Sequence, residues 1–129
     1  MAVKGFIKVE GADAVKGVVP QDLFGYWELE SGDTAVPLIV PRYSDKSVHI
    51  FAAPGKDYNG AIVSLEQSND PDLAKYVRAR DIYDTPISQT TDLDAKAWAI
   101  GPNSLAIKPT ITGGDANTMI RVCIVGKGN

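Results

Sequence analysis

The feature that most restricts the fold of this chain is a strict two-residue alternation within short segments. Near the end of the chain, Ile120, Val122 and Ile124 occupy every second position from Thr118 to Val125. Successive side chains of a β-strand point to opposite faces, whereas a helix buries residues three or four positions apart. Residues 118–125 are therefore predicted to form a strand with one buried face. The segments 61–67 and 105–112 alternate in the same way.

The alternating segments are short and closely spaced, because 12 glycines and 8 prolines interrupt the chain. This spacing is typical of sandwiches and barrels built from short strands. A length of 129 residues suits one domain with one core. We therefore predict an all-β, single-domain antiparallel β-sandwich, of the jelly-roll or immunoglobulin-like kind, with at most one short helix. The domain spans residues 1–129.

Three local expectations follow from the turn residues. Pro37 and Pro41 flank Leu38 to Val40, and proline cannot donate to a sheet ladder, so this run is expected at a sheet edge or in an extended connection. The Gly113-Gly114-Asp115 turn is expected to join the last two strands as a hairpin. Residues 70–84 fit either a short helical turn or a strand, and we favour a strand preceded by at most one helical turn.

Few residues of the chain have catalytic chemistry. His49 is the single histidine and Cys123 the single cysteine, which excludes the usual zinc ligand sets. The G-x-S-x-G pattern of a nucleophilic serine is missing. We expect Cys123 to be a small buried hydrophobe and His49 to be a packed or surface side chain. The chain is predicted not to be an enzyme and to need no cofactor.

The acidic clusters and the aromatic residues also have plain structural explanations. Asp70, Asp81 and Asp115 lie among turn residues without the spacing of a calcium loop, so we expect their carboxylates to bind local backbone. No metal site is predicted. Trp27 and Trp98 are expected in the core, although exposed tryptophans would suit a sugar-binding platform.

Charge and hydropathy limit the partners. The formal net charge is −3 and the pI is about 5.0, without the basic stripe of a nucleic-acid surface. No segment approaches the roughly 20 apolar residues of a membrane span, and the first residues do not form a signal peptide. We therefore expect assembly in a reducing cytoplasm, without nucleic-acid or membrane partners.

Three motifs resemble those of small bacteriophage virion proteins. Residues 65–70 (LEQSND) match a strand-and-turn motif in which glycine usually stands at Gln67, and residues 107–109 (IKP) match a motif in which arginine usually stands at Lys108. Residues 112–115 (TGGD) match the turn that follows. The resemblance spans about Trp27 to Val125.

The resemblance implies a head decoration, or cement, protein. Such a protein lies on the capsid surface of the virion, bridges neighbouring copies of the major capsid protein and has no active site; a homotrimer would suit the three-fold positions of an icosahedral shell. Residues 1–20 precede the matched region and are either an extended arm or the first strand. As an arm, they would contact the shell or a neighbouring subunit through Phe6, Ile7 and Val9. The alternative function is a carbohydrate- or receptor-binding module of a phage tail or fibre.

Overall fold

The computed structural model describes residues 1–9, 21–92, 97–101 and 103–128. Twelve strands are present in these residues, and the described part of the chain contains no helix. The strands are β1 (Val3–Lys4), β2 (Ile7–Lys8), β3 (Leu23–Glu30), β4 (Thr34–Ala35), β5 (Leu38–Ile39), β6 (Tyr43–Ala52), β7 (Ile62–Ser68), β8 (Val77–Arg78), β9 (Ser88–Gln89), β10 (Ala97–Ala99), β11 (Ala106–Thr112) and β12 (Met119–Gly128).

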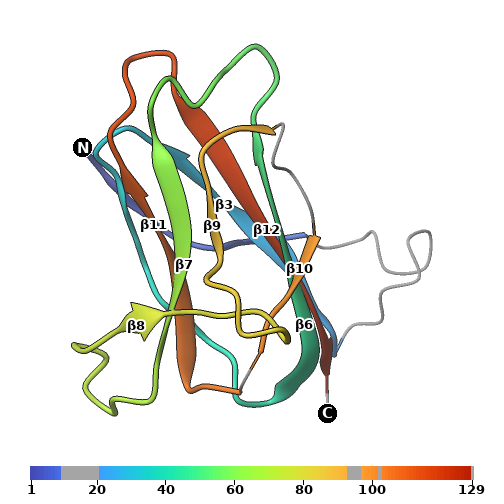
Figure 1. The fold of residues 1–129 in the computed structure, drawn as a ribbon. Helices are drawn as coiled ribbons and strands as arrows, with labels where there is room; N and C mark the ends of the chain where they lie inside the picture. The colour runs from blue at the N-terminus through green and yellow to red at the C-terminus, as the bar shows by residue number, and fades with distance from the viewer. Residues whose placement is uncertain (10–20, 93–96, 102, 129) are drawn as a thin grey trace.

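Two sheets form the sandwich (Figure 1). Sheet I has the order β10-β6-β12-β3-β2, and sheet II has the order β5-β11-β7-β8, with β9 also paired to β7. Every pair of strands within these two sheets is antiparallel. A separate parallel pair joins β1 to β4. The predicted all-β antiparallel sandwich is confirmed.

The alternation seen in the sequence places one face of each long strand in the core. In β12 the buried apolar side chains are Ile120, Val122 and Ile124, one of the two alternating sets in this run. The core lies between the two sheets and is almost wholly apolar. Its largest fully buried apolar side chains are Trp27, Leu29, Ile50, Leu65, Ile87, Ile107, Ile120 and Ile124.

Chain segments connect the two sheets at both open sides of the sandwich. On one side, β1 pairs with β4 and β2 pairs with the edge of sheet I at β3. On the other side, the backbone of Asp81 pairs with Ile100, and the amide of Gly101 donates to the carbonyl of Arg80 at 2.8 Å. These pairs cover part of the exposed backbone at the two sheet edges in the described residues.

The predicted hairpin between the last two strands is wrong. β11 pairs with β5 and β7 in sheet II, whereas β12 pairs with β3 and β6 in sheet I. Gly113 and Gly114 do turn the chain, with φ of 74° and 91°, but the turn carries it from one sheet to the other. A glycine turn indicates that the chain changes direction, but it does not indicate whether the two flanking strands pair in one sheet. Both strands bury one face whether they lie in the same sheet or in facing sheets.

The other two local expectations agree with the structure. β5 lies at an edge of sheet II, as Pro37 and Pro41 predict. In residues 70–84 the strand alternative holds: the chain turns after Asp70, whose carboxylate accepts hydrogen bonds from the backbone amides of Asp72, Ala74 and Lys75, and then enters β8. These local bonds replace the first turn of a helix.

Candidate functional site

The three predicted contact residues of the N-terminal segment lie along the edge of sheet I. Phe6 packs edge-on against Trp27, with ring centroids 4.9 Å apart. Ile7 pairs with Tyr26 and is 49% exposed, and the amide of Val9 donates to the carbonyl of Phe24 at 2.9 Å. Residues 3–4 and 7–8 thus take the strand alternative, and residues 10–20 lie outside the described residues.

Gly25 allows the N-terminal segment to lie this close to β3. A Cβ atom at this position would collide with the carbonyl oxygen of Ile7 and with the ring of Phe6. A glycine inside a strand commonly marks such a close approach of another backbone. The structure therefore explains a residue that interrupts the apolar pattern of β3.

Sheet I carries an unusual outer face. In register across its five strands lie Ala97, His49, Cys123, Tyr26 and Ile7. These residues alternate with the buried ones, so their side chains lie on the side of the sheet away from the core. We call the apolar, aromatic and imidazole side chains on this side the aromatic face: Ile7, Phe24, Tyr26, His49, Phe51 and Val125.

An ion pair lies within the aromatic face. The guanidinium of Arg121 donates to the carboxylate of Glu28 at 2.7 Å and lies 5.6 Å from the centre of the Tyr26 ring. Arg121 is also the register partner of Phe51. A guanidinium held by a carboxylate and an aromatic ring keeps a fixed orientation. Its remaining N–H groups can then donate to a partner.

The structure brings together the only histidine and the only cysteine. Cys123 is the register partner of His49 on the neighbouring strand. Its side chain lies on the outer face of sheet I and is half-buried. The prediction of a small buried hydrophobe is therefore wrong. Burial raises the pKa of the Cys123 thiol, although the nearby Arg121 opposes this shift. A thiol kept protonated is a poor nucleophile, so this pair lacks the activation of a Cys–His dyad.

The carboxylates predicted to serve turns do so. Asp81 accepts from the amides of Tyr83 and Thr85, and Asp115 accepts from the amide of Asn117 and the side chain of Asn59. Hydrogen bonds from these donors, led by Asn59, lower the pKa of Asp115. The described residues hold no group of three or more histidine, cysteine or acidic side chains that could bind a metal ion.

Both tryptophans are buried, as predicted. Trp27 lies in the core of sheet I, and Trp98 points inward from β10. Neither is therefore an exposed platform on which a sugar ring could stack.

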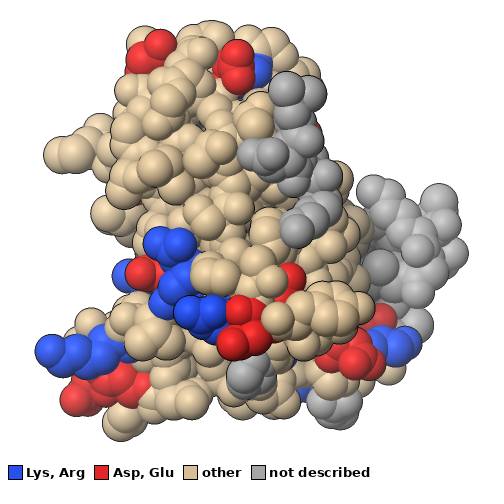
Figure 2. Space-filling view, in the orientation of Figure 1, with Lys and Arg blue, Asp and Glu red and all other residues tan. Residues whose placement is uncertain are grey.

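The outer face of sheet II differs in character. Figure 2 views the molecule from the side of β7 and β11 and shows most charged residues gathered over the lower half, with only a few at the top edge. In the register of the strands, Glu66 of β7 lies between Lys108 of β11 and Arg78 of β8. The Lys108 ammonium lies 4.2 Å from the centre of the Tyr76 ring. Such mixed surface charges are common on solvated faces and indicate no ligand.

Comparison with protein-family models, with curated proteins and with solved structures found no match. The likeness to phage virion proteins stays a prediction from the motifs quoted above. In the described residues there is no helix of the length and hydropathy needed to cross a membrane.

Sequence reasoning did not find the aromatic face as a unit. The available signal was that positions facing away from the core carry Phe24, Tyr26, Phe51 and Val125, where solvated strands usually carry polar residues. The register that joins these positions into one surface comes only from the structure.

Proposed function

We propose that this chain is a non-enzymatic structural protein of a virion, which decorates the head by binding neighbouring copies of the major capsid protein through the aromatic face. The observation that carries the proposal is the set of apolar and aromatic side chains around Arg121 on the outer side of sheet I. The motifs shared with small phage virion proteins supply the identity of the partner.

The composition of the aromatic face suits a protein partner. Cores of protein–protein interfaces are enriched in aromatic residues and arginine, and a few such side chains contribute most of the binding energy. Tyr26 and Arg121 are of the residue types that dominate these positions. Three copies of the chain around each three-fold position, forming a homotrimer, would let several moderate contacts act together.

Replacing Tyr26 with alanine should weaken binding to undecorated shells about tenfold or more, because truncating a central interface aromatic costs about 2 kcal/mol or more. Binding is measured by co-sedimentation of the purified protein with shells of the virus that encodes it. Tyr83→Ala is the matched control, since Tyr83 is 82% exposed and lies outside the aromatic face.

Equal binding by Tyr26→Ala and the unchanged protein would show that the aromatic face is not the contact. Failure of the unchanged protein to bind the shells at all would contradict the decoration function itself. Both variants should melt close to the unchanged protein, which separates loss of contact from loss of folding.

A further inference from the structure

Lys46 is a charged residue on the core side of sheet I. It follows the inward alternation of Val48 and Ile50 in β6 and is only 4% exposed. Lysine is rarely buried to this degree unless its charge is paired. The groups around Lys46 therefore determine whether its charge is compensated.

A bulge in β6 positions the lysine. Val125 pairs with Ser47 and Lys127 pairs with Ser44, so Asp45 and Lys46 together lie opposite the single residue between them in β12, Gly126. Asp45 has a φ of 49°, which is uncommon outside glycine. Bulges of this kind redirect a side chain and are frequent next to functional sites.

Gly126 leaves room for the aliphatic part of the lysine. A Cβ atom on Gly126 would stand 3.0 Å from Cγ of Lys46 and 3.3 Å from Cβ of Tyr43. These distances are shorter than ordinary contacts, so a larger residue would displace the lysine. The bulge and the glycine together direct the Lys46 ammonium toward Tyr43, the first residue of β6.

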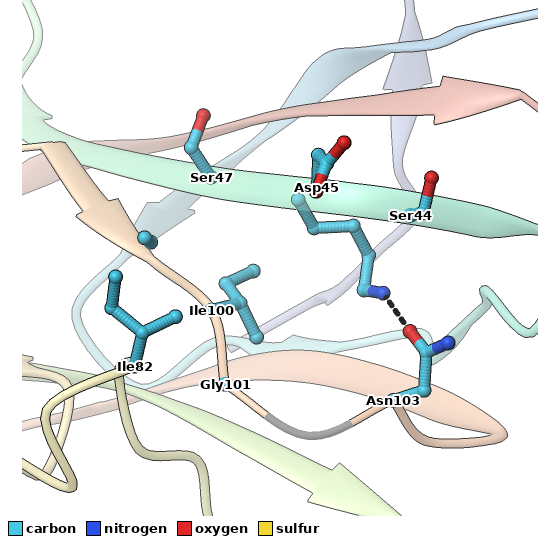
Figure 3. A pocket seen from close by; sticks show the side chains of 9 residues that line it. Ser44, Asp45, Ser47, Ile82, Ile100, Gly101 and Asn103 are labelled. Carbon is cyan, nitrogen blue, oxygen red and sulfur yellow. Dashed lines mark hydrogen bonds between the residues drawn. The ribbon is translucent and has the colours of Figure 1, made fainter.

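Among the described residues, the Lys46 ammonium donates to two acceptors, and both are neutral. It donates to the carbonyl of Tyr43 at 3.1 Å and to the side-chain oxygen of Asn103 at 2.6 Å, and Figure 3 draws the bond to Asn103. In the part of the chain that the structure describes, Lys46 forms no ion pair with a carboxylate. An ammonium has three donors, so one remains for a ligand.

Burial and charge act on Lys46 in opposite directions. Burial lowers the pKa of its ammonium, and the attraction of Asp45 raises it but does not cancel the effect of burial. Asp45 is exposed, so water screens its charge. The positive charge of Lys46 is thus incompletely compensated within the described residues.

The lysine borders a cavity of about 520 Å³ with walls of two kinds. Ile82, Ala99 and Ile100 supply apolar surface, while Ser44, Ser47 and Asn103 supply neutral polar atoms (Figure 3). The solvent-exposed carboxylate of Asp45 also lines the cavity. This volume lies within the range of small-molecule sites, which combine apolar walls with a few polar groups.

We infer that this cavity binds a small aliphatic carboxylate. Its carboxylate would accept a hydrogen bond from the Lys46 ammonium beside Asn103, and its alkyl part would lie against Ile82 and Ala99. A charge-assisted hydrogen bond to a desolvated ammonium is stronger than one to a neutral donor. This cavity lies at the start of β6, so its ligand binding is independent of the proposed docking through the aromatic face.

Titration of the isotope-labelled protein with sodium butyrate, followed by nuclear magnetic resonance, tests the inference. The expected result is saturable shifts of the amide signals of Ser47, Ile100 and Gly101. Lys46→Met should weaken butyrate binding about tenfold or more, because it removes a hydrogen bond to a charged group. Lys56→Met is the matched control, since Lys56 is exposed beyond the other end of β6.

A second ligand and a further variant complete the test. Butylammonium chloride has the same alkyl chain and the opposite charge, so it should not bind; equal shifts with both salts would overturn the carboxylate assignment. Ile82→Trp narrows the cavity and keeps Lys46, so it should also weaken binding if Lys46→Met fails to fold. The inference is wrong if butyrate causes no saturable shifts, or if it binds a folded Lys46→Met variant as tightly as the unchanged protein.

Discussion

Replacing Trp27 with alanine should lower the free energy of unfolding by about 3–5 kcal/mol, the usual cost of truncating a large buried aromatic side chain. Trp27 is fully buried in the core and contacts the edge of the Phe6 ring. Its indole N–H also donates to the carbonyl of Val36 at 3.0 Å. The variant loses its core packing and the contact with Phe6, and it leaves the Val36 carbonyl without its donor. Equilibrium denaturation with urea measures the change.

The neighbouring residue provides the control for this prediction. Tyr26 lies on the opposite side of β3, on the aromatic face, so Tyr26→Ala should cost much less stability than Trp27→Ala. Equal losses from the two substitutions would contradict the assignment of buried and outer faces in β3. Trp27→Phe should fall between them, because it keeps an aromatic ring but lacks the indole donor.

Replacing Asp33 with alanine should lower the free energy of unfolding by about 2–3 kcal/mol, because donors in a partly buried site would lose their acceptor. The Asp33 carboxylate accepts from the backbone amides of Ala2 at 2.9 Å and Glu30 at 2.8 Å. It also forms an ion pair with Lys4 at 3.2 Å. Asp33 therefore attaches the first residues of the chain to the turn after β3.

The stability contributed by Asp33 should depend on pH. Burial alone would raise the pKa of this carboxyl, but the hydrogen bonds from Glu30, Lys4 and Ala2 together outweigh it, so the pKa lies below its ordinary value of 3.8. Because the pKa is lower in the folded state, the ionised carboxylate stabilises the protein at pH values above the ordinary pKa of 3.8. This contribution is lost as the pH falls through the folded-state pKa.

Asp33→Asn isolates the charge, because the amide has nearly the same shape and cannot ionise. The difference in unfolding free energy between the unchanged protein and this variant should be largest near neutral pH and should shrink as the pH falls toward 3 and below. Urea denaturation at several pH values measures it. A difference that stays constant over this range would show that the charge of Asp33 does not contribute.

Much of the fold was predictable from local pattern. The alternation in residues 118–125 predicted a strand with two distinct faces, and the prolines around Leu38–Ile39 predicted a sheet edge or an extended connection. The pairing of the last two strands was not predictable, because Gly113 and Gly114 specify a turn and not a partner. The candidate surface was predictable only in part: Ile7 was a candidate, while Tyr26 and Phe51 were not.

The sequence by itself determined the long alternating strands, such as residues 118–125, and where the chain turns, because these properties depend on neighbours within a few positions. Only the tertiary structure decided which strands lie side by side. It placed Cys123 between His49 and Tyr26, and it brought Lys46 to Asn103, 57 positions away in the chain. Such contacts depend on strand order and register, which arise from the packing of the whole core rather than from any single segment.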